Sequence, residues 1–85
     1  MERTPLQAAG TELVTAAGWT EGRTERRLHG EVIELAKLGV GDEPTPEALD
    51  GHVAALRELA TEAGPGAEHV ERALAHVREY RETVE

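Results

Sequence analysis

Apolar residues recur at intervals of three and four along most of the chain, the spacing of one face of an α-helix. Glycine and proline divide this pattern into four segments, which predict helices over about 5–17, 21–38, 46–63 and 67–83. The joints between these segments are short, so neighbouring helices should run antiparallel. We therefore expect an all-α fold in which residues 1–85 form one small antiparallel bundle of four helices, the first of them short.

The ends of the predicted helices are marked by local sequence. Thr-Pro occurs at 4–5 and again at 45–46, where the threonine can cap free amides and the proline suits the first helical position. Thr20 is expected to cap the second helix in the same way. Gly39 should end that helix, and 40–44 is the longest predicted loop. The other stop signals are Gly18 and the sequence Gly64-Pro65-Gly66.

The second predicted helix is apolar over more than half of its circumference. A helix with so wide an apolar arc usually packs against neighbours on two sides. We therefore expect this helix to be the central element of the bundle. Its apolar residues are Leu28, Val32, Ile33, Leu35, Ala36 and Leu38.

The fourth predicted helix carries a narrower apolar stripe with the spacing of a coiled coil. The stripe either packs inside the bundle or forms a seam with a second copy of the chain. Large apolar side chains are scarce, since phenylalanine is absent, so a single copy should have little surplus stability. We therefore expect a homodimer that completes the bundle through this stripe. Its residues are Val70, Ala73, Val77, Tyr80 and Val84.

Trp19 lies at the joint between the first two predicted helices. The expected role of a tryptophan at such a joint is to plug the open end of the bundle. The alternative is an exposed anchor for a partner, because tryptophan is enriched at the energetic centres of protein interfaces. Trp19 therefore joins the candidate partner-binding residues.

The charge of the chain bears on its partners. A net charge of −8 repels a phosphate backbone, so no nucleic-acid binding is expected. Arg23, Arg26 and Arg27 share one face of the second helix and are candidate anion-binding residues, because guanidinium groups hold carboxylates and phosphates. Glu21 and Glu25 neutralise part of this cluster, and the alternative is a mixed, solvated face.

The residue types argue against catalysis and metal binding. Serine and cysteine are absent, which removes the commonest nucleophiles and every disulfide. No two histidines have the spacing that lets one helix grip a metal ion, so a metal site would need histidines from different helices. Acidic pairs such as Glu58/Glu62 are expected to be solvated. We expect no catalytic residues, no cofactor and no enzyme activity. The histidines are His29, His52, His69 and His76.

These observations favour a non-enzymatic protein–protein interaction module that acts through a helical face, as an accessory subunit, an immunity or antitoxin protein, or a regulatory binding protein. Its acidic charge suits a basic protein surface, and its thin core suits a second copy of itself. The alternative is a small-molecule or metal-binding bundle that uses core-facing histidines and carboxylates. The chain starts without the basic and apolar regions of a signal peptide and has no membrane-spanning apolar run, so we expect a cytoplasmic location and no membrane partner.

Overall fold

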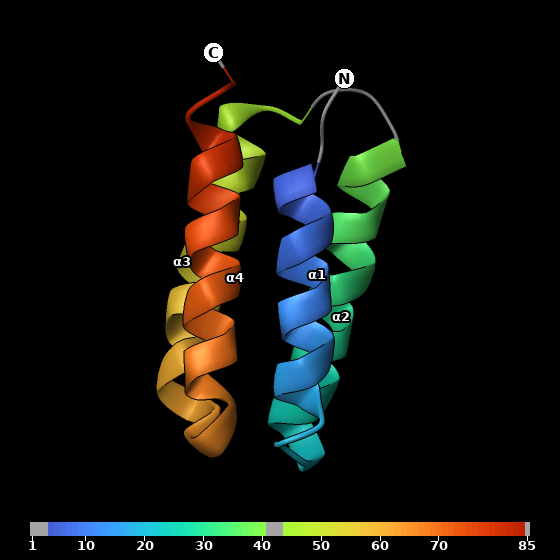
Figure 1. Cartoon of the computed structure of the whole chain (residues 1–85), viewed down its shortest axis with the longest axis vertical. Helices are drawn as coiled ribbons and strands as arrows, with labels where there is room; N and C mark the ends of the chain where they lie inside the picture. Colours follow the sequence, from blue (N-terminus) through green and yellow to red (C-terminus); the bar gives the residue numbers. More distant parts are fainter. Residues whose placement is uncertain (1–3, 41–43, 85) are drawn as a thin grey trace.

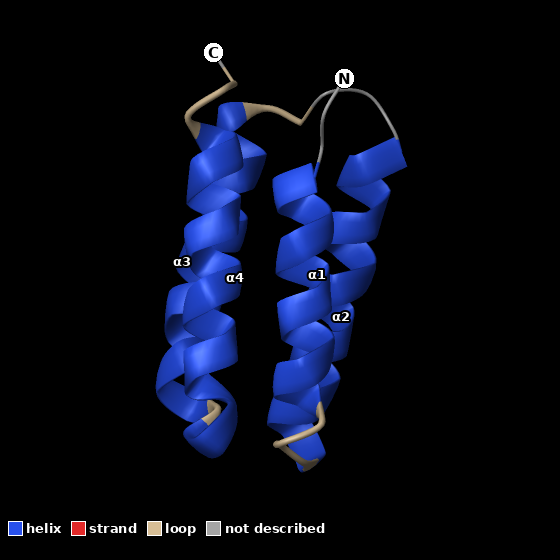
Figure 2. Cartoon of the chain, in the orientation of Figure 1, coloured by secondary structure: helices blue, strands red, loops and turns tan. Residues whose placement is uncertain are grey.

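The structure is a computed structural model that describes residues 4–40 and 44–84, with side chains for 5–38 and 44–84. Four helices run alternately down and up (Figures 1 and 2), and the described ranges contain no strand. The predicted all-α bundle is confirmed, and its first helix is the shortest. The helices are α1 (Thr4–Ala17), α2 (Gly22–Val40), α3 (Pro46–Glu62) and α4 (Ala67–Arg81), and a single 3-10 turn, η1 (Gly64–Gly66), joins the last two.

The helices form two hairpins that meet through α1 and α4. Each of these two helices packs on the other and on its own hairpin partner, whereas α2 and α3 touch one another much less. Figure 1 shows α1 and α4 side by side between the other two helices. The expectation that α2 is the central element is therefore wrong, because α2 packs mainly against α1.

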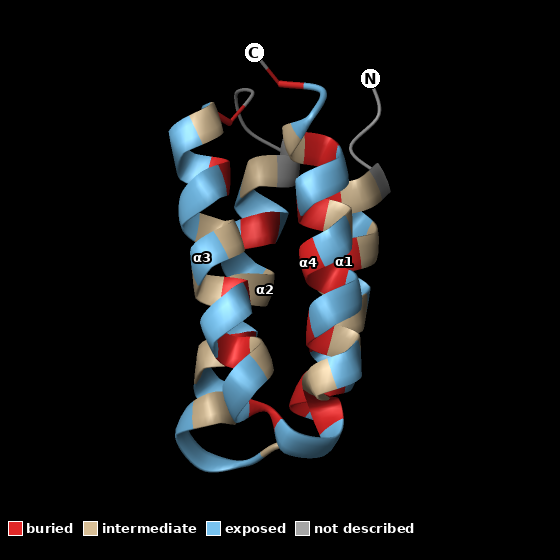
Figure 3. Cartoon of the chain, turned by 90° about the vertical axis from the view of Figure 1, so that its left-hand side faces the viewer, coloured by how far each residue is buried: buried red, intermediate tan, exposed pale blue. Residues whose placement is uncertain are grey.

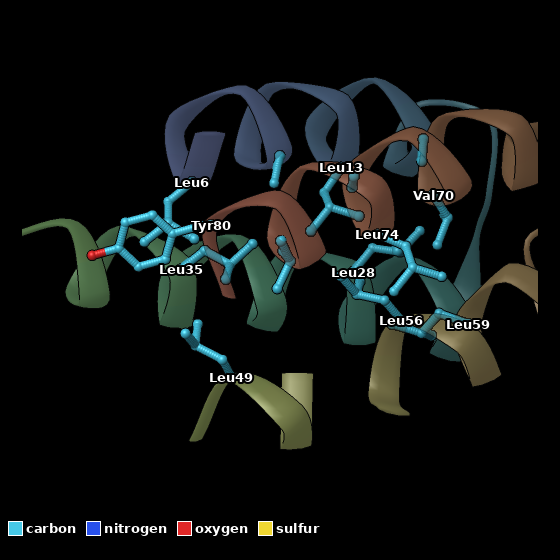
Figure 4. Close-up of a cluster of buried hydrophobic side chains, with 14 of the residues drawn as sticks. Leu6, Leu13, Leu28, Leu35, Leu49, Leu56, Leu59, Val70, Leu74 and Tyr80 are labelled. Carbon is cyan, nitrogen blue, oxygen red and sulfur yellow. The ribbon is translucent and has the colours of Figure 1, made fainter. Parts of the chain in front are cut away.

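The core is built from leucines and from small residues where α1 and α4 meet. Ala9 and Ala16 of α1 and Ala73 of α4 are completely buried, and small side chains let two helices approach closely. Leucines from all four helices belong to the same buried cluster (Figure 4). The core leucines are Leu6, Leu13, Leu28, Leu35, Leu49, Leu56, Leu59 and Leu74.

The helix ends confirm some of the local sequence signals and contradict others. Thr45 caps α3 as predicted, because its hydroxyl accepts a hydrogen bond from the backbone N–H of Ala48 at 3.1 Å. Thr20 does not cap α2; its hydroxyl instead donates to the carbonyl of Ala17 at 3.1 Å. The start of α2 at Gly22, which has a φ of 69°, leaves Thr20 too far from the first turn. Gly39 does not end α2, which continues to Val40. The predicted cap at Thr4 and most of the predicted 40–44 loop lie outside the described residues and side chains.

The turn between α3 and α4 lies tightly against the end of α1. A Cβ atom on Gly66 would lie 2.9 Å from the carbonyl oxygen of Ala16 and 3.3 Å from its Cα. Only glycine fits this approach without a shift of backbone, and Gly64 has a φ of 54°, a conformation that glycine adopts readily. The sequence Gly64-Pro65-Gly66 therefore ends α3 as predicted and also lets the second hairpin pack closely against the first.

No helix in the described residues is long and apolar enough to cross a membrane. The outward surfaces of α3 and α4 are largely exposed (Figure 3).

Candidate interaction surface

The apolar stripe of α4 lies inside the bundle. Val70, Ala73 and Val77 are completely buried, and Tyr80 and Val84 are nearly so. In Figure 4 the ring of Tyr80 lies near Leu6 and Leu35, and its hydroxyl points away from the cluster. This corrects the expected partner seam: α4 is flanked by both α1 and α3, so the stripe is used by the core of the same chain.

The large apolar side chains that remain exposed belong to one hairpin. In the described part of the chain they are Val14, Trp19 and Ile33, with 55%, 60% and 56% of their surface exposed. Val14 lies on α1, Ile33 on α2, and Trp19 in the joint between them. The expectation that Trp19 plugs the end of the bundle is therefore wrong. Its side chain is exposed, as the alternative interpretation requires.

A shallow hollow lies between the two helices of this hairpin. It measures about 240 Å³ and is lined by Val14 from α1 and by His29, Val32 and Ile33 from α2. We call these four residues the α1–α2 face. The hollow is open to solvent and its lining is mostly apolar.

The outer side of α1 carries no charge. Glu12 is the one charged residue in Thr4–Ala17, and it faces α4, where its Oε1 lies 2.8 Å from Nδ1 of His69. The exposed Thr11 and Thr15 donate their hydroxyls to the helix's own carbonyls, both at 3.2 Å, which leaves fewer free polar groups on this side. The α1–α2 face thus borders a helix surface without any ionised group.

Charge is distributed unevenly between the two hairpins. Residues 4–40 contain five acidic and four basic side chains, a net charge of −1. The described residues 44–84, which form α3 and α4, contain eight acidic and four basic side chains, a net charge of −4. The exposed apolar residues therefore lie on the nearly neutral half of a strongly acidic chain.

The arginine cluster predicted on α2 is divided. Arg27 binds α3, with its Nη2 2.6 Å from Oε1 of Glu58 and its Nη1 3.0 Å from Oε1 of Glu62. The hydrogen bond that Arg27 donates to Glu58 and the charges of both carboxylates raise the pKa of Arg27 above its ordinary value. Arg23 and Arg26 are exposed and form no ion pair with any other described residue. The structure thus places Arg27 in a bridge between α2 and α3, and it does not bring the three arginines together as one anion site.

Two histidine–glutamate pairs join the hairpins. Nδ1 of His52 on α3 lies 2.8 Å from Oε1 of Glu31 on α2, and His69 pairs with Glu12 across α4 and α1 at the same distance. The hydrogen bond that the imidazole of His52 makes to the carboxylate of Glu31 raises the pKa of His52, aided by the charges of Glu31 and Glu34 and opposed by burial. The pairs span 21 and 57 residues of sequence, so helical spacing could not reveal them. One signal was present: Glu12 is a lone charge on an otherwise uncharged helix.

The other titratable groups do not assemble into a site. Within the described ranges, no group of three or more histidines, aspartates or glutamates is placed to hold a metal ion. Nδ1 of His76 lies 3.7 Å from Oε1 of Glu79 on its own helix, and the Glu58/Glu62 pair binds Arg27. The only histidine on the α1–α2 face is His29.

Comparison with known proteins matches the chain to a protein family. The model of a family of unknown function, DUF7553, matches residues 1–83, which includes all four helices. No curated protein and no solved structure matches the chain.

Proposed function

The chain belongs to the DUF7553 family, and we propose that it is a non-enzymatic protein–protein interaction module that binds its partner through the α1–α2 face. In this proposal the module works in the cytoplasm and binds neither nucleic acid nor membrane. The roles that suit it are those of an accessory subunit, an immunity or antitoxin protein, or a regulatory binding protein.

The observation that carries the proposal is the gathering of exposed apolar side chains on one hairpin. Val14, Trp19 and Ile33 are each more than half exposed, and Val14 and Ile33 line the same hollow. Centres of protein interfaces are depleted in charge and rich in aromatic and large apolar side chains. The residues of the α1–α2 face are mostly large and apolar, and Trp19 adds an exposed aromatic side chain at the end of the same hairpin.

The wide apolar arc of α2 supports the same conclusion. Leu28 and Leu35 are buried toward the bundle, while Ile33 is exposed and Ala36 is exposed beside it. A helix that is apolar on more than one side is usually packed on more than one side. The bundle covers one side of α2, and the proposal assigns the other side to a partner.

The alternative, a small-molecule or metal-binding bundle, finds no specific support. In the described residues, the side chains buried in the core are all apolar, so histidines and carboxylates do not meet in the core. The hollow on the α1–α2 face offers only His29 as a polar lining residue. A small polar ligand needs several convergent polar groups, which this hollow lacks.

Photocrosslinking in cells tests the proposal. A photoreactive amino acid is introduced in place of Ile33 or, as the matched control, in place of the exposed Ala75 of α4. A discrete protein adduct is expected from position 33 and not from position 75. The proposal is overturned if position 33 gives no adduct, or if both positions give the same adducts.

A further inference from the structure

We infer that the partner at the α1–α2 face is a second copy of this chain, in a twofold-symmetric dimer that joins the two α1–α2 faces. This inference rests on the proposed function and names the partner for the same surface. A twofold interface places one surface patch against itself, so every charge near its axis meets a like charge. Such an interface forms only where a surface of the chain can meet its own copy without repulsion.

The α1–α2 face meets this condition. Val14, Val32 and Ile33 are apolar, and the outer side of α1 has no ionised group. Three charged residues of the hairpin are directed to the other hairpin by their ion pairs, namely Glu12, Glu31 and Arg27. The charges of the remaining three acidic and three basic residues of the hairpin sum to zero, so these residues give two copies of the hairpin no net repulsion: Glu21, Glu25, Glu34, Arg23, Arg26 and Lys37.

The acidic charge of the α3–α4 hairpin also favours a dimer through the α1–α2 faces. The described residues 44–84 carry a net charge of −4, so contact between two α3–α4 hairpins would bring like charges together. A dimer through the α1–α2 faces leaves both α3–α4 hairpins on the outside, where their carboxylates stay in water. A basic partner would be drawn to that acidic half rather than to the uncharged face. The distribution of charge therefore favours a second copy at the α1–α2 face.

The size of the face predicts a weak dimer. With a rise of 1.5 Å per residue, a 14-residue α1 is about 21 Å long, and two packed helices give a face roughly 20 Å wide. This corresponds to roughly 400 Å² on each copy, about half of the 800 Å² per partner that is usual in stable complexes. Dissociation constants in the micromolar to submillimolar range are therefore expected, and the test must reach such concentrations.

Sedimentation equilibrium of the purified full chain, from about 10 µM to about 1 mM, is the test. The unchanged chain is expected to dimerise in this range. Ile33→Asp should weaken the dimer by at least about tenfold, because each copy then buries a charge without a partner in an apolar interface. Ala75→Asp makes the same change in charge on an exposed position of α4 and should leave the dimer unchanged.

Circular dichroism of each variant checks that the bundle is intact. Val14→Asp, also at an exposed position, replaces Ile33→Asp if that variant does not fold and should weaken the dimer in the same way. A monomer over the whole range overturns the inference, as does a dimer that Ile33→Asp and Val14→Asp leave intact or that Ala75→Asp weakens equally. If the purified chain is monomeric while position 33 crosslinks to a different protein in cells, the inference fails and the proposed function stands. If no adduct forms either, both fail.

Discussion

Replacing Gly66 by alanine should destabilise the bundle, although alanine is the better residue for most helical positions. Gly66 packs against the end of α1, and the added Cβ would lie 2.9 Å from the carbonyl oxygen and 3.3 Å from the Cα of Ala16. Both are backbone atoms, so they cannot rotate out of the way. The strain must be relieved by moving the turn or the last residues of α1, which loosens the contact between the two hairpins.

The expected magnitude follows from two opposing terms. Forcing an extra methyl group into a close-packed site costs about 1–3 kcal/mol. The backbone of Gly66 already has a right-handed helical conformation, with φ −88° and ψ −1°, so alanine also restricts the unfolded chain and returns about 0.4–1 kcal/mol. A net loss of about 1–2 kcal/mol is expected, which in a domain of this size lowers Tm by about 5–15 °C.

Gly51→Ala is the matched control. Gly51 lies inside α3, is exposed, and has no atom within 4 Å of the position of an added Cβ. The same chemical change should there raise the free energy of unfolding by about 0.5–1 kcal/mol, because alanine favours the helix. Guanidinium titrations followed by circular dichroism measure both variants. If Gly66→Ala proves as stable as the unchanged chain, the close approach of η1 to α1 is not a packing constraint and the reasoning is refuted.

Two further predictions concern the core and the junction between the hairpins. Val77→Ala should lower the free energy of unfolding by about 2 kcal/mol, because the side chain is completely buried. The exposed Glu79→Ala should change it by less than about 0.5 kcal/mol. If the decrease in Tm caused by Val77→Ala varied with protein concentration in thermal scans, Val77 would belong to a seam between copies. The pKa of His52 is raised by Glu31, so its stabilising contribution should be complete below the ordinary histidine pKa of about 6.5 and should decline as pH rises through the higher pKa of the folded state. His52→Gln should remove that decline in denaturant titrations at a series of pH values, and a chain whose pH dependence is unchanged by the substitution would contradict the assignment.

The helices could be predicted from sequence because their signals are local. Helix 5–17 was expected and α1 spans Thr4–Ala17; helix 46–63 was expected and α3 spans Pro46–Glu62. Apolar spacing, Thr45 at the start of α3 and glycine at the ends act within one or two turns, so they do not depend on the rest of the fold. Two local signals failed. Thr20 does not cap α2, and Gly39 remains helical because nothing local forces it into a left-handed conformation.

The arrangement of the helices could not be predicted in the same way. An apolar stripe shows that one side of a helix is covered but not which element covers it. The stripe of α4 was expected to meet a second copy, yet α1 and α3 bury Val77 and Tyr80 within one chain. The pairs His52–Glu31 and His69–Glu12 depend on how the hairpins meet, and that information is not contained in the spacing along any one helix.

The near absence of charge on α1 becomes informative once its neighbours are known. In a chain with 31% charged residues, a 14-residue helix with Glu12 as its one charge is expected to be covered on most sides. The structure covers two sides, with α4 and α2, and Glu12 lies on the α4 side. The third side carries the exposed Val14 and threonines bonded to their own helix. It continues into Ile33, the exposed part of the wide apolar arc of α2. Val14 and Ile33 line the same hollow on one hairpin, so a single partner can cover both exposed side chains.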